Sequence, residues 1–149
     1  MSAVDGMPIV DNNELFAISY SGQLLGIDLA SRQVMFVNEL ASLKSLAVNN
    51  QQVIATSLDG KVVAYNRSNG EVLWESEELA YRHLTNPVMI GNYIAVGDFD
   101  GVVHLFDPAS GKIVSRVQTK GALTNLQVQG SLLMTQSTAG QVAIWQLAR

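Results

Sequence analysis

The chain has 149 residues, a formal net charge of −4, 48% hydrophobic residues and 15% charged residues. This length predicts one domain, and the apolar content with few charges excludes a disordered chain. The nine Lys and Arg residues stand singly along the sequence, which argues against nucleic acid as a partner because phosphate binding needs clustered positive charge. The chain has no Cys, so disulfide frameworks and thiolate metal sites are excluded.

Membrane and export signals are not evident in these residues. The longest apolar runs, such as residues 132–134, are far shorter than the roughly 18 residues that a membrane helix requires. Residues 1–5 have neither the basic start nor the apolar stretch of a secretory signal. We therefore expect any export signal to lie outside this sequence.

An internal repeat of about forty residues is the main signal in the sequence. Four glycines in turn-like segments mark it, with successive separations of 38, 41 and 39 residues: Gly22, Gly60, Gly101 and Gly140. Five positions after each glycine stands a bulky side chain: Ile27, Tyr65, Phe106 and Trp145. Three positions before each stands a polar one: Ser19, Ser57, Asp98 and Ser137. Each unit therefore repeats one design.

The first two units occupy approximately residues 7–40 and 45–79. In the first, the apolar run 15–18 predicts a buried strand, and Arg32 predicts a different turn because later units have Gly there. In the second, Asp59-Gly60 between β-rich runs is a strong hairpin signal. Four strands are predicted in this unit, near residues 46–48 and at 52–57, 61–65 and 71–75.

The third and fourth units occupy approximately residues 86–119 and 125–149, and the fourth ends at its third strand. The chain thus contains three complete four-stranded units and one three-stranded unit, or about fifteen predicted strands. Four-stranded units of this period predict an all-β fold, a β-propeller of antiparallel blades. A β-sandwich is disfavoured because its strands would not repeat at a fixed period.

The number of units leaves the closure of the propeller open. Either the four units close by themselves, or they form part of a larger ring, which we favour. Residues 1–7 are too short and too poor in β-formers to predict a closing strand. An isolated half ring would expose two apolar blade faces and favour self-association. Two copies could then form an eight-bladed ring, which is a hypothesis from this arithmetic.

Residues that resemble chemical sites have structural interpretations that fit better. Asp98-Phe99-Asp100-Gly101 lacks the further ligands of a calcium loop and is read as a hairpin. His104 lies in a strand column and is read as a rim or packing residue, and His83 as a residue of the inter-blade connection without a nearby partner. Trp74 is read as inter-blade packing rather than a binding platform. We predict no catalytic residue, metal or cofactor.

Several segments carry a family resemblance. Residues 60–66 with 69–74, and residues 96–101 with 107–112, resemble the PQQ-like propeller repeat. Residues 15–22 and 79–88 narrow the resemblance to one family. The whole chain is similar to the C-terminal half of the BamB family of periplasmic lipoprotein propellers. The resemblance implies an eight-bladed intact protein, lipid-anchored at the periplasmic face of the outer membrane. It also implies a non-catalytic scaffold that binds the POTRA domains of BamA and assists the insertion of outer-membrane proteins, with nascent outer-membrane proteins as a further partner.

Two residues are the candidate partner contacts. Asp5 matches an acidic loop position tied to the BamA contact in the family, but Ala3 stands where relatives can carry a second Asp. Arg82 is an exposed candidate in a loop, with structural pairing as the alternative. Two other functions remain alternatives, a fragment of a PQQ-dependent dehydrogenase-type propeller and a ligand-sensing propeller domain.

Overall fold

The computed structural model describes residues 8–38 and 43–146, and fifteen β-strands lie in them. In chain order they are β1 (Ile9–Asp11), β2 (Glu14–Ile18), β3 (Leu24–Asp28), β4 (Gln33–Asn38), β5 (Leu43–Val48), β6 (Gln52–Ser57), β7 (Val62–Asn66), β8 (Val72–Ser76), β9 (Val88–Ile90), β10 (Tyr93–Gly97), β11 (Val102–Phe106), β12 (Ile113–Gln118), β13 (Leu123–Gln129), β14 (Leu132–Ser137) and β15 (Val142–Gln146). They form four antiparallel sheets, β1-β2-β3-β4, β5-β6-β7-β8, β9-β10-β11-β12 and β13-β14-β15. The predicted all-β fold with repeated four-stranded units is confirmed.

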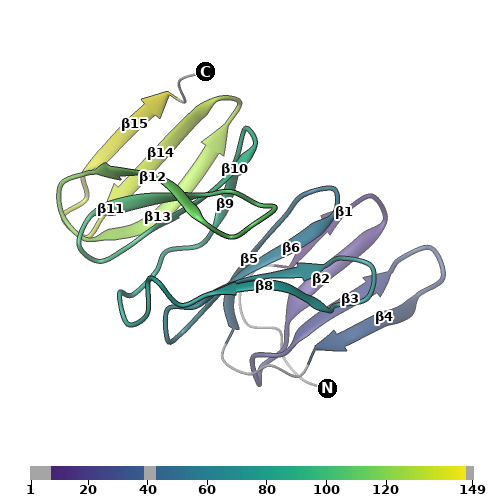
Figure 1. Cartoon of the computed structure of the whole chain (residues 1–149). Helices are drawn as coiled ribbons and strands as arrows, with labels where there is room; N and C mark the ends of the chain where they lie inside the picture. The colour runs from purple at the N-terminus through teal and green to yellow at the C-terminus, as the bar shows by residue number, and fades with distance from the viewer. Residues whose placement is uncertain (1–7, 39–42, 147–149) are drawn as a thin grey trace.

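The four sheets stand side by side, with the first and the fourth at opposite ends of the molecule (Figure 1). Their first strands meet in sequence, since β1 contacts β5, β5 contacts β9 and β9 contacts β13. This is the arrangement of propeller blades, in which each sheet packs its face on the next one. In the described residues, no helix is long and apolar enough to cross a membrane.

The central hairpin of each sheet closes in the same way. The polar residue three positions before the turn glycine accepts a hydrogen bond from the backbone N–H four residues further on, over 2.9 to 3.3 Å. The accepting side chains are Ser19, Ser57, Asp98 and Ser137. This repeated bond explains why the column is polar in every unit, because a short oxygen-bearing side chain satisfies a turn N–H that the ladder leaves free.

The outer hairpin of each four-stranded sheet turns through a left-handed residue. Gly70 and Gly111 have φ of 73° and 75°, and Arg32 has φ of 60°. For the backbone conformation at this position, the expectation of a different turn at Arg32 is therefore wrong. Phe36 lies directly over Gly70, where a Cβ would collide with its ring, whereas the exposed Arg32 has room for its side chain.

Trp74 joins the second and third sheets. Its ring covers Gly111, where an added Cβ would lie 2.5 Å from the ring atoms. The indole also stacks on Phe106, with centroids 6.2 Å apart, and its Nε1–H donates a 2.7 Å hydrogen bond to the carbonyl of Pro108. Trp74 is thus an inter-blade packing residue, as the sequence predicts, and its polar atom is satisfied within the protein.

Three hydrophobic clusters fill the three seams between neighbouring sheets. A buried cation reinforces the first seam. Arg67 is 5% exposed, and its guanidinium bonds Asp11 and Glu14 of the first sheet at 2.8 to 2.9 Å while it lies over the ring of Phe16. Because a buried charge is costly unless it is paired, this cluster fixes how the first sheet sits on the second.

We expect Trp74→Ala to lower the free energy of unfolding by about 3 kcal/mol, because it removes the stack on Phe106 and leaves a cavity over Gly111. Urea denaturation followed by circular dichroism would measure the change. Leu73→Ala is the matched control, since Leu73 is 49% exposed on the same strand and should cost far less. Equal losses for the two variants would contradict the role of Trp74 in the seam.

Candidate partner-binding site

The connection between β8 and β9, residues 77–87, is held between two hairpin turns. The backbone N–H of Tyr81 donates to the carbonyl of Asp59 at 3.0 Å, and the N–H of Phe99 donates to the carbonyl of Arg82 at 3.0 Å. Gly60 lies so close to the connection that a Cβ there would be 2.6 Å from the Leu79 carbonyl oxygen. The connection is therefore fixed by backbone contacts on both sides.

This fixed connection presents large side chains to solvent. Tyr81 is 83% exposed, Leu58 on one adjoining turn is 70% exposed and Phe99 on the other is 57% exposed. Tyr81 and His83, on either side of Arg82, have φ of 63° and 53°, a conformation that L residues adopt only when the surroundings impose it. The His83 ring packs edge-on against Phe99 with centroids 5.7 Å apart, so the expectation that His83 has no nearby partner is wrong.

Asp98 is the buried residue that connects the exposed segment 77–87 to the third sheet. It is fully buried, and its Oδ1 accepts hydrogen bonds from the N–H groups of Asp100 and Val102 at 2.9 and 3.0 Å. Its Oδ2 lies 2.7 Å from His104 Nε2 and 3.5 Å from Arg82 Nη1. The segment 98–101 is a hairpin turn, as predicted, and its first carboxylate also pairs with the candidate residue Arg82.

His104 continues this polar chain into the third sheet. It is 1% exposed, and its Nδ1 accepts a 3.1 Å hydrogen bond from Nε of Arg116. A guanidinium can only donate, so the imidazole proton lies on Nε2 and is donated to Asp98. Burial lowers the pKa of His104 below its usual value despite the opposing effect of Asp98. His104 is therefore a neutral, buried packing residue at pH 7, in agreement with the structural interpretation of its strand column.

Hydrogen bonds also shift the pKa of the Asp98 carboxyl. Burial by itself would raise the pKa of the Asp98 carboxyl, but the His104 and backbone hydrogen bonds outweigh it and hold the pKa below its usual value. Sequence reasoning missed this pair. A signal was present, because the third unit alone has Asp in a column of Ser residues and His in a column of Leu25, Val63 and Ala143.

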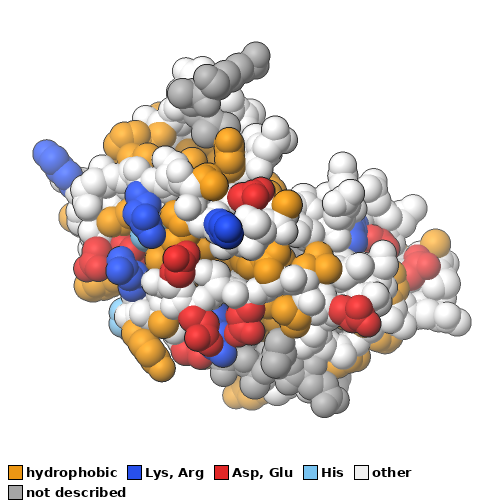
Figure 2. Space-filling view, in the orientation of Figure 1, with side chains coloured by type: hydrophobic (Ala, Val, Ile, Leu, Met, Phe, Trp, Pro, Cys, Tyr) orange, Lys and Arg blue, Asp and Glu red, His pale blue; other side chains and the backbone are white. Residues whose placement is uncertain are grey.

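The two sequence-predicted contact residues have different outcomes. Asp5 lies outside the described residues. Arg82 is exposed, with 44% of its side chain accessible, and is paired with Asp98, so the structural pairing is present and the partner contact stays a prediction. On the face in Figure 2, acidic and basic side chains are interspersed with separate apolar patches. Within residues 8–38 and 43–146, no group of three His, Asp or Glu side chains could hold a metal ion.

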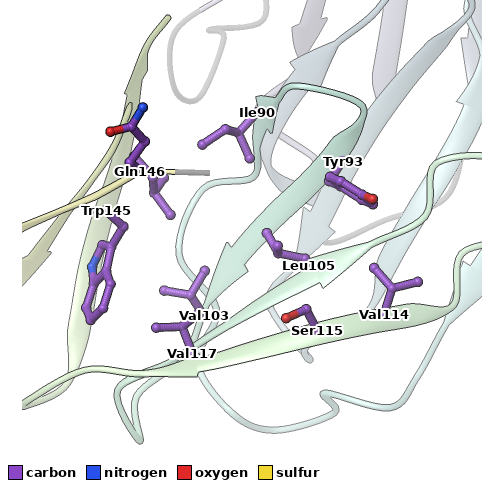
Figure 3. A pocket seen from close by; sticks show the side chains of 10 residues that line it. Ile90, Tyr93, Val103, Leu105, Val114, Ser115, Val117, Trp145 and Gln146 are labelled. Atoms are coloured by element: carbon purple, nitrogen blue, oxygen red, sulfur yellow. The ribbon is translucent and has the colours of Figure 1, made fainter. Parts of the chain in front are cut away.

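An apolar pocket of about 380 Å³ lies between the third and fourth sheets (Figure 3). Val103, Leu105 and Ser115 line it from the third sheet, and Leu133 and Trp145 line it from the fourth. Ser115 occupies the repeat position that holds Phe36 and Trp74 in the first two sheets. A small side chain thus stands here in place of the aromatic ring of the earlier seams, and the fourth sheet, three-stranded in the described residues, has no outer hairpin opposite it.

We expect His104→Gln to reduce the loss of stability in mild acid. Because the pKa of His104 is lowered in the folded chain, the unfolded chain takes up the proton more readily, and wild-type stability falls as the pH drops below 6.5. Glutamine keeps a donor for Asp98 but does not titrate. Urea denaturation at pH 7.5 and 5.5 would measure the difference, with the exposed His83→Gln as control. Equal losses in wild type and His104→Gln would contradict this mechanism.

We expect Ser115→Phe to raise the free energy of unfolding by about 1 kcal/mol, because the new ring fills an apolar pocket. Thermal and urea denaturation would measure it against Ser131→Phe, which adds the same ring at an exposed turn. A decrease in stability for Ser115→Phe would show that the pocket cannot accept the ring.

A family model and the curated relatives of the chain agree on one family. A family model described as outer membrane protein assembly factor BamB matches residues 1–76 and 58–148. BamB from Salmonella typhimurium is 32% identical over 95% of this chain, which covers 37% of that protein. The chain thus spans a little over a third of the length of such curated relatives.

Solved structures show the same fold. The crystal structure of BamB from Moraxella catarrhalis matches with a TM-score of 0.92 and 53% identity, covering 98% of this chain and 44% of that one. A europium-containing methanol dehydrogenase matches with a TM-score of 0.65 and 18% identity over 81% of this chain and 27% of its own, which is a likeness of fold alone. From the family model, the relatives and the fold together, the chain belongs to the BamB family of outer-membrane protein assembly factors.

Proposed function

We propose that the chain acts as a non-catalytic scaffold in outer-membrane protein assembly, at the periplasmic face of the outer membrane and lipid-anchored in the intact protein. The observation that carries this proposal is the family match over nearly the whole chain, together with a fold that superimposes on a BamB structure. Since the chain spans little more than a third of its curated relatives, the activity of the whole protein comes to it only as part of this proposal.

The proposed partner is the POTRA region of BamA, with Arg82 and Asp5 as contact residues. The surroundings of Arg82 support this choice. Arginine and tyrosine are the side chains that dominate the energy of many protein interfaces, and here Arg82 and Tyr81 lie on a connection fixed by backbone hydrogen bonds to both adjoining turns. A fixed loop loses little conformational entropy on binding. Nascent outer-membrane proteins are a second proposed partner of the same scaffold.

No specific observation favours the alternative functions. The likeness to a methanol dehydrogenase concerns the fold alone, because identity is 18%. The apolar pocket between the third and fourth sheets is explained by the small residue Ser115 in a seam position. A quinone-dependent reaction or a ligand-sensing role is therefore not proposed.

The test is a calorimetric titration of the chain with the isolated POTRA domains. We expect binding by the wild-type chain and about tenfold weaker binding by Arg82→Ala, because a central Arg contact is commonly worth about 1.4 kcal/mol or more. Lys112→Ala is the matched control, an exposed cation on the β11–β12 turn, and should bind like wild type. Thermal unfolding would establish that each variant is folded.

Two results would contradict different parts of the proposal. A folded wild-type chain that does not bind the POTRA domains would remove the proposed partner. Normal binding by a folded Arg82→Ala variant would leave the partner in place and remove Arg82 from the interface, so that its role is the pairing with Asp98.

A further inference from the structure

Asp98 and His104 depart from the repeat. Three positions before the turn glycine, the other three units have a serine, and three positions after it they have an aliphatic side chain: Ser19, Ser57 and Ser137, and Leu25, Val63 and Ala143. Asp98 is 0% exposed and His104 is 1% exposed. Of the four units, therefore, only the third places a carboxylate and an imidazole at these two positions, and it buries both.

The hairpin turn does not require the carboxylate. The hydrogen bond from the backbone N–H four residues further on is accepted by Asp98 Oδ1 at 3.0 Å in the third sheet and by the Ser57 hydroxyl at 2.9 Å in the second. The two turn glycines have the same conformation, with φ of 84° at Gly101 and 89° at Gly60. A hydroxyl thus closes this turn as a carboxylate does, and the second oxygen of Asp98 is left for another contact.

The position of His104 does not require an imidazole either. Val63 occupies the same column in the second sheet and is 3% exposed, so an aliphatic side chain fills this place there. Replacing a buried ionic group and its partner by well-packed apolar side chains is often neutral or stabilising. The stability of the fold therefore does not account for the buried pair.

The second oxygen of Asp98 holds Arg82. Oδ2 lies 2.7 Å from His104 Nε2 and 3.5 Å from Arg82 Nη1. Because two turn N–H groups bind Oδ1 and His104 binds Oδ2, the carboxylate has a fixed orientation toward the guanidinium. The rest of the Arg82 side chain faces solvent, since 44% of it is accessible.

The backbone of Arg82 is held independently of this ion pair. Its N–H donates to the carbonyl of Leu79 at 3.2 Å, and its carbonyl accepts from the N–H of Phe99 at 3.0 Å. These bonds fix where the side chain begins but not where the guanidinium lies. An arginine has many rotamers, and restricting them on binding costs free energy. The pairing with Asp98 restricts them before a partner arrives.

We propose that Asp98 is a positioning residue, which holds the Arg82 guanidinium in the orientation that contacts the partner, and that His104 fixes the Asp98 carboxylate for this purpose. The inference rests on the proposed binding of the POTRA domains through Arg82, and it adds the residues that prepare that contact. Because Asp98 is buried, it acts on a partner only through Arg82. The contribution of the buried pair is then preorganisation of the binding residue.

Exchanging the pair for the residues of the second unit tests the proposal on the full chain. Asp98→Ser with His104→Val, the double variant, supplies the hydroxyl and the aliphatic side chain that this hairpin has in the second sheet. We therefore expect the double variant to fold, and thermal unfolding would check it. Asp98→Asn is a second variant, which keeps Oδ1 as the turn acceptor and removes the charge that pairs with Arg82.

The first readout is the motion of the guanidinium, which does not depend on any partner. The heteronuclear NOE of the Arg82 Nε–H group reports motion on the picosecond to nanosecond timescale, and its signal is assigned by its loss in Arg82→Ala. We expect a high NOE in the wild type and a clearly lower one in the double variant and in Asp98→Asn. Arg32, on an exposed turn, is the internal control and should give a low NOE in all three proteins.

The second readout is calorimetric titration with the isolated POTRA domains. We expect the double variant to bind about two- to tenfold more weakly than the wild type, because a mobile arginine has to be ordered on binding. In an Arg82→Ala background the same exchange should have no further effect, since Asp98 acts through Arg82. Lys112→Ala, at an exposed position of the β11–β12 turn, is the control and should bind like the wild type.

The outcomes distinguish this inference from the function on which it rests. A folded wild-type chain that does not bind the POTRA domains would remove the proposed partner, even if the NOE of Arg82 falls as expected. An unchanged NOE in the double variant would overturn the positioning role of Asp98, as would wild-type affinity of the folded double variant or a further loss of affinity in the Arg82→Ala background. Failure of both Asp98 variants to fold would also overturn it, because the hairpin would then need the carboxylate.

Discussion

The fold depends on the contact between one sheet and the next. One unit of a repeat protein cannot bury its apolar faces alone, and here neighbouring sheets cover one another at three seams. Trp74 on an outer strand closes over Gly111 of the following sheet, as Phe36 closes over Gly70. The glycine is required for two reasons at once, the left-handed turn and the approach of the ring. The sequence repeats about every forty residues because the same positions of each sheet pack in these seams.

Polar groups hold the first seam together and hold the exposed connection 77–87 against the third sheet. Arg67 ties the second sheet to Asp11 and Glu14 of the first. In the third sheet, the buried Asp98 gathers two turn N–H groups, a neutral His104 and the exposed Arg82. Such a satisfied network is rigid because each member would be costly to leave unpaired. The proposed scaffold role agrees with this rigidity, since a fixed loop would lose little conformational entropy on binding.

The ends of the arc follow from the same physics. Each seam has two halves, and among the described residues the outer faces of the first and fourth sheets have no facing sheet. The strands of the fourth sheet contain no charged residue, and on their exposed face aliphatic side chains such as Met134 alternate with amides such as Gln127 and Gln136.

The period, the strands and the hairpin turns could be predicted from the order of the amino acids, because alternation and turn chemistry act between residues close in the chain. It also predicted the packing role of Trp74, since that position recurs. Three features became evident only in the folded chain: the left-handed conformation of Arg32, the packing of His83 on Phe99, and the polar chain of Asp98, His104 and Arg116. These outcomes depend on strand register and on which sheet covers which turn, and both are set by packing across the seams rather than by neighbouring residues in the sequence.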